Sequence, residues 1–103
     1  MAKRVRFTLS FAPQGIEHLD RIDSKYHGVL RRAIKEQLTY TPTEETRNRR
    51  PLDQPAPFEA SWELRCGPEN RFRVFYDVDA DESVVTVLRV LSKEAALRYL
   101  QEK

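Results

Sequence analysis

The sequence predicts an α+β fold in the order β-α-α-β-β-β-α, in which a helical hairpin packs on one face of a small, mostly antiparallel sheet. Three observations favour this fold. Apolar residues alternate strictly over residues 4–11, which is typical of a half-buried strand. Over residues 26–38 they recur at spacings of three and four, on one face of a helix. Three further apolar segments between residues 58 and 91 are separated only by short turns, so we expect antiparallel neighbours.

The first strand is expected to lead into two helices. Pro13 suits the first turn of a helix, where its missing N–H costs nothing, so a helix is predicted over residues 13–22. Asp23 or Ser24 can cap a second helix. Thr41-Pro42 ends it, because the residue before a proline avoids the helical region. Since the two helices are joined almost directly, they are expected to form an antiparallel hairpin.

The next segment, residues 41–57, is expected to be a long irregular connection. It contains four prolines and three arginines, Arg47, Arg49 and Arg50. Long connections in small domains are often functional. The three arginines are therefore candidates to bind an RNA backbone, with a solvated loop as the alternative.

The remainder of the chain is expected to complete the sheet and to end in a helix. Strands are predicted over residues 58–66, 72–78 and 84–91, and a closing helix over residues 94–100. The first two strands alternate in polarity. The third is rich in β-branched residues and is apolar on both faces except for Thr86 and Arg89, which indicates a central strand. The sheet face opposite the hairpin is expected to remain partly open.

Length and composition exclude several classes of protein. The chain has 103 residues, so we expect a single domain over residues 1–103. Its 40% hydrophobic content is too high for a disordered chain, and no apolar run reaches the roughly 20 residues of a membrane helix. No signal peptide is expected, because no apolar stretch follows the basic N-terminus. The single cysteine, Cys66, excludes an internal disulfide and suits the cytoplasm.

No metal or other cofactor is expected. His18 and His27 both fall in the helical hairpin, nine residues apart, with no cysteine or carboxylate pair at metal-binding spacing. The three glycines do not form a phosphate-binding loop. Cys66 lies on the apolar side of its strand, where a plain core role is expected.

A cationic face of the sheet is the strongest chemical feature. The net charge is only +2, but Arg65 and Arg73 point away from the apolar faces of strands joined by a short turn. Lys93, after the last strand, and Tyr99, in the closing helix, are placed to converge on them. Such cations can stabilise charge that develops on a phosphate. The alternative is an ordinary solvated face of charged residues.

The sequence also resembles the RelE/ParE superfamily of bacterial toxins from type II toxin–antitoxin modules. The resemblance covers nearly the whole chain, and it is carried by the strand and helical hairpin followed by Trp62-Glu63-Leu64-Arg65, Arg71-Phe72-Arg73-Val74-Phe75-Tyr76-Asp77-Val78 and Val87-Leu88-Arg89-Val90-Leu91-Ser92-Lys93. The segment Glu45-Thr46-Arg47-Asn48-Arg49-Arg50-Pro51-Leu52 fits it too. It implies a RelE-like fold, an antitoxin protein as partner, and no cofactor.

The resemblance implies one of two activities. RelE-type relatives cut messenger RNA in the A site of the small ribosomal subunit, without a metal, through attack of the ribose 2′-OH that gives a 2′,3′-cyclic phosphate. In that case Arg73 holds the phosphate, Lys93 assists the leaving group, Tyr99 orients or deprotonates, and Arg65 is a further catalytic cation. ParE-type relatives instead inhibit DNA gyrase. A degenerate member would only bind its antitoxin.

Two departures from the family pattern bear on activity. Glu63 stands where the family has a cation, and its carboxylate either acts as a base or weakens RNA binding. Leu91-Ser92 replaces the usual glycine at the corner before Lys93.

Three further residues are candidate RNA contacts. Arg71 and Arg89 are predicted to contact RNA as the loop arginines do, and Phe75 either stacks on a base or packs under the closing helix. The hairpin cations Arg31, Arg32 and Lys35 either form a solvated face or meet an acidic antitoxin.

Overall fold

Strands and helices follow the predicted order, with one additional short strand, in the computed structural model. The structure describes residues 5–52 and 60–101, without the side chains of residues 99–101. The elements are β1 (Thr8–Phe11), α1 (Pro13–Arg21), the 3-10 turn η1 (Ser24–Tyr26), α2 (His27–Leu38), β2 (Arg49–Pro51), β3 (Trp62–Cys66), the 3-10 turn η2 (Pro68–Asn70), β4 (Phe72–Asp79), β5 (Val84–Ser92) and α3 (Lys93–Gln101). No helix in this part of the chain is both long and apolar enough to cross a membrane.

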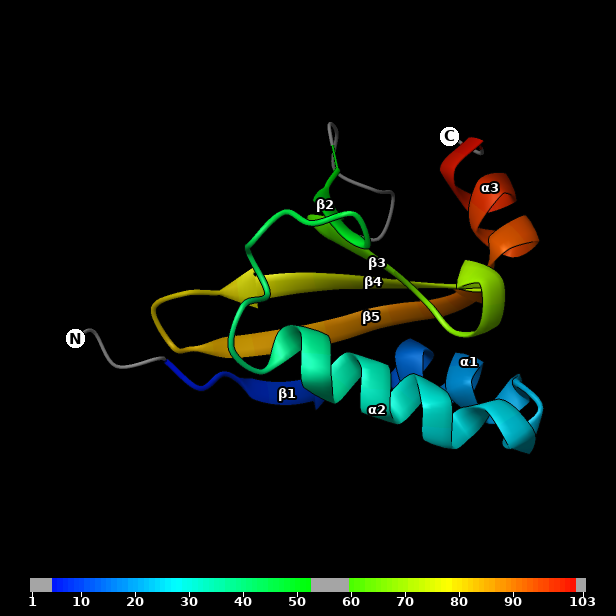
Figure 1. The fold of residues 1–103 in the computed structure, drawn as a ribbon, viewed down its shortest axis with the longest axis horizontal. Coiled ribbons are helices and arrows are strands. Elements are labelled where there is room, and N and C mark those ends of the chain that lie inside the picture. The colour runs from blue at the N-terminus through cyan, green and yellow to red at the C-terminus, as the bar shows by residue number, and fades with distance from the viewer. Residues whose placement is uncertain (1–4, 53–59, 102–103) are drawn as a thin grey trace.

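One five-stranded sheet holds these elements together, in the order β1-β5-β4-β3-β2. β1 runs parallel to β5, and the other neighbours are antiparallel. The predicted mostly antiparallel sheet is therefore confirmed, with β5 inside it as expected. α2 packs on one side of the sheet, α1 lies beside β5 beyond the end of β1, and α3 stands on the other side (Figure 1). We call these two sides the α2 face and the α3 face.

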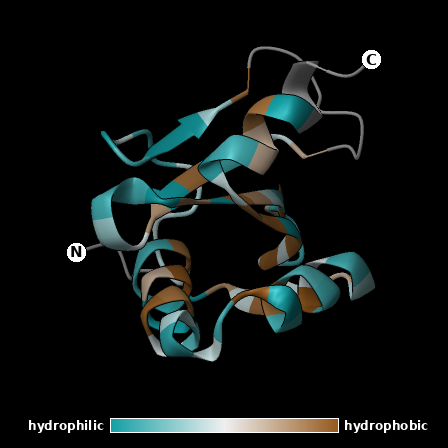
Figure 2. Ribbon diagram, turned by 90° about the vertical axis from the view of Figure 1, so that its right-hand side faces the viewer, coloured by the Kyte–Doolittle hydropathy of each residue, from teal (hydrophilic) through white to brown (hydrophobic). Residues whose placement is uncertain are grey.

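The main core lies between α2 and the sheet. Leu30, Ile34 and Leu38, four residues apart in α2, are fully buried against residues of β3, β4 and β5. Burial of each such side chain is worth roughly 1.5–3 kcal/mol. Figure 2 shows the apolar residues of the helices turned toward the sheet. On the α3 face a smaller cluster packs Phe75 and Leu91 against Ala96 of α3, so much of that face is left to polar residues.

Two local features of the helices have clear causes. The Asp23 carboxylate accepts the backbone N–H of Lys25 at 3.0 Å and caps η1, whereas the predicted cap of the second helix is not formed at α2, whose N-cap residue Tyr26 makes no side-chain cap bond. Gly15 lets α1 approach β5 closely, because a Cβ atom there would lie 2.8 Å from the backbone oxygen of Val87. The side chain that any other residue carries would separate the helix from the strand.

The structure corrects three of the predicted boundaries. The connection over residues 41–57 is not wholly irregular, because β2 forms within it and pairs with β3 through Arg49 and Leu64. β1 is shorter than the predicted strand, and Val5, outside it, is exposed. β3 begins at Trp62 rather than at residue 58, although residues 53–59 lie outside the described part of the chain.

Candidate active site

Three neighbouring strands bring four charged residues together on the α3 face. Arg65 of β3 is paired directly with Arg73 of β4. This confirms the prediction that the two arginines are neighbours. One step along the sheet, Arg50 of β2 is paired with Glu63 of β3. We call Arg50, Glu63, Arg65 and Arg73 the arginine cluster.

Glu63 lies at the centre of the arginine cluster. Only 4% of its side chain is exposed, and its Oε1 atom is 3.0 Å from Nε of Arg65, 3.7 Å from Nε of Arg73 and 4.0 Å from Nε of Arg50. Three cations surround one carboxylate, so the cluster keeps a net positive charge. A carboxylate buried to this degree is expected to be paired with cations, and this one meets three.

The three arginines differ in how freely they can move. Arg73 is only 8% exposed, and its Nη1 donates to the backbone oxygens of Asn70 at 2.6 Å and Phe72 at 3.3 Å. Burial, and then repulsion from Arg65, lowers the pKa of Arg73, while Glu63 acts in the opposite direction. The side chains of Arg65 and Arg50 are 34% and 55% exposed. Arg73 is therefore fixed within the sheet, and the other two can reach a ligand.

The remaining predicted catalytic residues lie at the end of β5. Lys93 is the first residue of α3, it is exposed, and its backbone N–H donates to the backbone oxygen of Arg71 at 2.8 Å. Since Leu91 is paired with Arg73, Lys93 follows two residues beyond the strand partner of that arginine. Tyr99 belongs to α3, but its side chain lies outside the described part of the structure.

Arg49, a predicted RNA contact, is used inside the protein instead. It is 5% exposed, and its guanidinium donates to the backbone oxygen of Gln37, to that of Glu44 at 3.0 Å and to the hydroxyl of Thr41 at 2.9 Å. These bonds join β2 to the end of α2 and to the loop that follows. Arg50, the next residue, points to the opposite face, because side chains alternate along a strand.

The other predicted RNA contacts do not join the arginine cluster as ligand-binding groups. Phe75 is fully buried in the small core under α3, so it has no face on which a base could stack. Arg71 lies 5.4 Å over the ring of Tyr26 and donates to its hydroxyl, which attaches it to the helical hairpin. Arg89 is half-buried and donates to the backbone oxygen of Leu88 at 2.8 Å. Arg47 is exposed.

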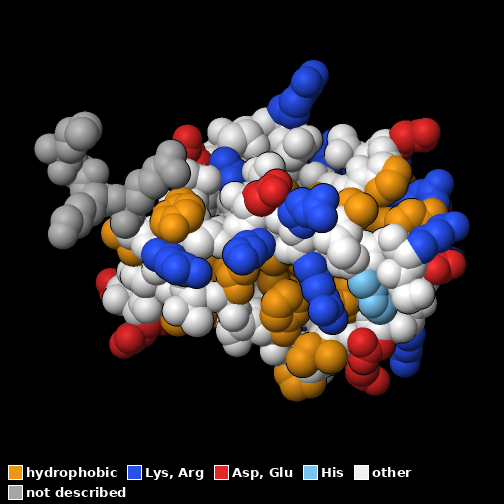
Figure 3. Space-filling view, turned by 60° about the horizontal axis from the view of Figure 1, so that its bottom comes forward, with side chains coloured by type: hydrophobic (Ala, Val, Ile, Leu, Met, Phe, Trp, Pro, Cys, Tyr) orange, Lys and Arg blue, Asp and Glu red, His pale blue; other side chains and the backbone are white. Residues whose placement is uncertain are grey.

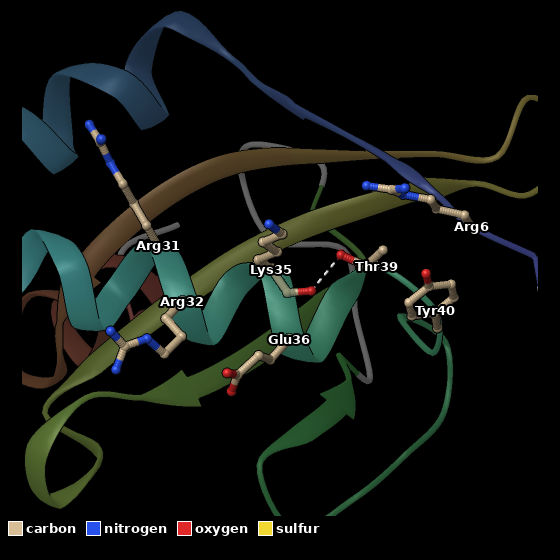
Figure 4. A pocket seen from close by; sticks show the side chains of 7 residues that line it. All are labelled: Arg6, Arg31, Arg32, Lys35, Glu36, Thr39 and Tyr40. Atoms are coloured by element: carbon tan, nitrogen blue, oxygen red, sulfur yellow. Dashed lines mark hydrogen bonds between the residues drawn. The ribbon is translucent and has the colours of Figure 1, made fainter.

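A second cationic region lies on the outside of the helical hairpin. Arg6 and the α2 residues Arg31, Arg32 and Lys35 line a hollow of about 630 Å³ (Figure 4). It adjoins an apolar groove of about 370 Å³, floored by β1, α1 and α2, that shares Arg31 with it. In Figure 3, which brings this side forward, Lys and Arg side chains lie beside exposed apolar ones. We call the two hollows together the hairpin groove.

Cys66 and His27 are held by contacts inside the protein. Cys66 is buried in the main core, and burial raises its pKa to about 12, so the thiol stays protonated at neutral pH. His27 makes a hydrogen bond to the backbone oxygen of Ile22 at 2.8 Å. Within residues 5–52 and 60–101, no three His, Cys, Asp or Glu side chains are grouped as metal ligands would be.

Comparison with known proteins places this arrangement in a family. Residues 9–97 match a family model described as the ParE toxin of the type II toxin–antitoxin system parDE. No curated protein matches the chain. Among solved structures, the toxin–antitoxin complex RelBE2 from Mycobacterium tuberculosis matches at 20% identity with a TM-score of 0.71, over 90% of this chain and 98% of the other. An archaeal RelE–RelB complex from Pyrococcus horikoshii matches at 16% identity with a TM-score of 0.65, over 85% and 96%. The RelE-like fold is therefore confirmed.

Proposed function

We propose that this chain, which belongs to the ParE toxin family of type II toxin–antitoxin systems, acts as a ribosome-dependent endoribonuclease on messenger RNA. The observation that carries the proposal is the arginine cluster. It offers three guanidinium groups on the α3 face, two of them accessible to a ligand. Guanidinium groups match phosphate oxygens in geometry and charge. Because translating ribosomes are the proposed target, we also propose that the toxin acts in the cytoplasm.

The proposed reaction needs no bound metal. The ribose 2′-oxygen attacks the adjacent phosphorus, the bond from phosphorus to the 5′-oxygen breaks, and the products are a 2′,3′-cyclic phosphate and a 5′-OH. Arg65 contacts the phosphate oxygens and stabilises the negative charge that accumulates on them, and Arg73 adds its positive charge from its fixed position within the sheet. We assign removal of the 2′-OH proton to Tyr99 and protonation of the 5′-oxygen to Lys93, as the family resemblance implies.

Glu63 is poorly placed for the base role. With 4% of its side chain exposed and three guanidinium groups around it, its carboxylate is not open to a ribose hydroxyl. The cluster thus supplies charge stabilisation more readily than proton transfer. Ribosomal RNA is then required to hold the 2′-OH in line with the phosphate. Orientation of that kind can supply a large part of the rate acceleration.

The test is cleavage of messenger RNA on programmed ribosomes. The wild-type toxin should cut in the A site, and Arg65→Gln should reduce the rate by about tenfold or more, the loss of one charge-assisted contact. Arg32→Gln, which removes a cation from the hairpin groove, is the matched control and should cut normally. Absence of cuts by folded wild-type toxin, or equal loss in both variants, would contradict the proposal.

Inhibition of DNA gyrase is the second candidate. The match to the ParE family favours it. The internal contacts of Arg73 favour it as well, because this guanidinium already donates to two backbone oxygens and lies 3.7 Å from a carboxylate, which leaves it less able to bind a phosphate. A supercoiling assay separates the two candidates. Inhibition of gyrase by the wild-type toxin, without cleavage on ribosomes, would establish this second function.

We further propose that the hairpin groove receives an acidic, amphipathic segment of the antitoxin. The two solved structures compared above, which are similar to this chain, are toxin–antitoxin complexes. The groove combines an apolar floor with four cations, Arg6, Arg31, Arg32 and Lys35, which outnumber its two carboxylates, Asp20 and Glu36. This lining matches such a segment in polarity and charge. The double variant Arg31→Glu/Lys35→Glu should bind the antitoxin more weakly, as measured by calorimetry, than Arg21→Glu, which changes a residue outside the groove. Equal affinities of the wild type, the double variant and Arg21→Glu would refute this assignment.

A further inference from the structure

The carboxylate of Glu63 stands where a phosphate would be expected to bind. Its Oε1 accepts from Nε of Arg65 at 3.0 Å and lies within 4.0 Å of the guanidinium groups of Arg73 and Arg50. A carboxylate and a phosphate present similar oxygens to guanidinium groups. We propose that Glu63 is an internal counterion that competes with RNA phosphate for Arg50 and Arg65. This inference deepens the proposed function and rests on it for the identity of the ligand.

Arg73 is held more firmly than Arg50 and Arg65, and this difference decides which arginines an incoming phosphate can take from Glu63. Arg73 is bound to two backbone oxygens and is almost fully buried, so it stays with Glu63 when a ligand arrives. Arg50 and Arg65 are held only through Glu63 among the ion pairs and side-chain hydrogen bonds of the described residues, and both are partly exposed. An incoming phosphate therefore takes these two guanidinium groups from the carboxylate.

The competition lowers the affinity of the free toxin for RNA. A phosphate that binds Arg65 through Nε has to replace a charge-assisted hydrogen bond that is already formed. Single-stranded RNA in solution provides few other contacts, so it binds weakly. A structured ribosomal site provides many additional phosphate contacts, which offset the loss of the internal ion pairs. Glu63 thus acts on ligand affinity through the arginines and does not itself touch the substrate.

The experiment measures binding without chemistry. A short single-stranded 2′-O-methyl RNA, which cannot be cleaved, is titrated into wild-type toxin, Glu63→Gln and Glu82→Gln, and anisotropy is followed at several salt concentrations. Glu82→Gln is the control because it makes the same charge change at an exposed turn position. Glu63→Gln should bind about tenfold more tightly than this control, the equivalent of one charge-assisted contact. Its salt dependence should steepen by about 0.7 in log–log slope, the value for one further phosphate.

A purely structural role for Glu63 predicts no gain in affinity. The arginines would then lose their positions in Glu63→Gln, and affinity would fall or would equal that of Glu82→Gln. Either outcome in a folded variant overturns the proposal.

A second measurement avoids any folding defect of the variant. In wild-type toxin, NMR signals of Nε–H of Arg65 and of the Glu63 carboxyl carbon are followed during titration with the same RNA. Both should move together as the ion pair is replaced. A shift at Arg65 without one at Glu63, or no shift at either, would refute the competition. Because neither readout requires cleavage, a failure of the nuclease proposal on ribosomes is distinguished from a failure of this inference.

Discussion

Replacement of Arg49 by Met tests whether this arginine stabilises the fold or binds RNA. The side chain is 5% exposed and makes three hydrogen bonds, to the backbone oxygens of Gln37 and Glu44 and to the hydroxyl of Thr41. A hydrogen bond from a charged group contributes roughly 1.5–3 kcal/mol. Met keeps most of the apolar stem, and the acceptors near the surface regain water. We therefore expect Arg49→Met to lower the free energy of unfolding by about 3 kcal/mol, well below the sum of three bonds.

Urea denaturation of the purified toxin measures this loss, with Arg50→Met as the matched control. Arg50 is the next residue, but its side chain is 55% exposed and its nearest carboxylate atom is 4.0 Å away. Exposed ion pairs contribute about 0–1 kcal/mol, so Arg50→Met should unfold almost as the wild type does. RNA binding should show the reverse order, with the larger loss in Arg50→Met. A stable Arg49→Met protein that has lost RNA affinity would refute the reasoning.

Three further predictions concern local packing and protonation, each measured by urea denaturation. Gly15→Ala should destabilise the fold by about 1–3 kcal/mol, because its Cβ would lie 2.8 Å from a backbone oxygen of β5, whereas Gly28→Ala has free space and should be neutral or stabilising by up to about 1 kcal/mol. Tyr76→Phe should cost about 1–3 kcal/mol, because it leaves the buried carbonyl of Pro42 without the hydroxyl that donates to it at 2.6 Å. Burial, and then the charges of arginines, lowers the pKa of His18 below 6.5, so the unfolded chain binds a proton at this histidine more readily than the folded chain does. The free energy of unfolding should therefore fall as the pH drops below about 6.5, and His18→Gln should reduce that fall. Equal stability of the two glycine variants, an unchanged Tyr76→Phe protein, or parallel pH profiles for wild type and His18→Gln would each contradict the corresponding account.

Residue patterning predicts most of the sheet and the neighbouring positions of Arg65 and Arg73. Alternation assigns both side chains to the same face of their strands, and the short turn between the strands fixes their register. The same reasoning could not find β2, because the three residues from Arg49 to Pro51 have no apolar alternation and form a strand only by pairing with β3. Without β2, the sequence does not predict that the side chains of Arg49 and Arg50 point to opposite faces of the sheet.

The position of Glu63 at the centre of the cluster also depends on tertiary structure. Its departure from the family pattern is visible in the sequence, but its contacts with Arg50 and Arg73 require three strands in register. Phe75 illustrates the same limit. Its strand position assigns it to the α3 face, yet only the packing of α3 over that face shows that it is core.

The most direct test applies one preparation of the toxin, freed of its antitoxin, to programmed ribosomes and to DNA gyrase in parallel. The account predicts cuts in the messenger RNA at the A site, with a 2′,3′-cyclic phosphate on the upstream fragment, and normal supercoiling by gyrase. Intact messenger RNA together with inhibited gyrase would contradict it, and would assign the arginine cluster to the stability of the sheet.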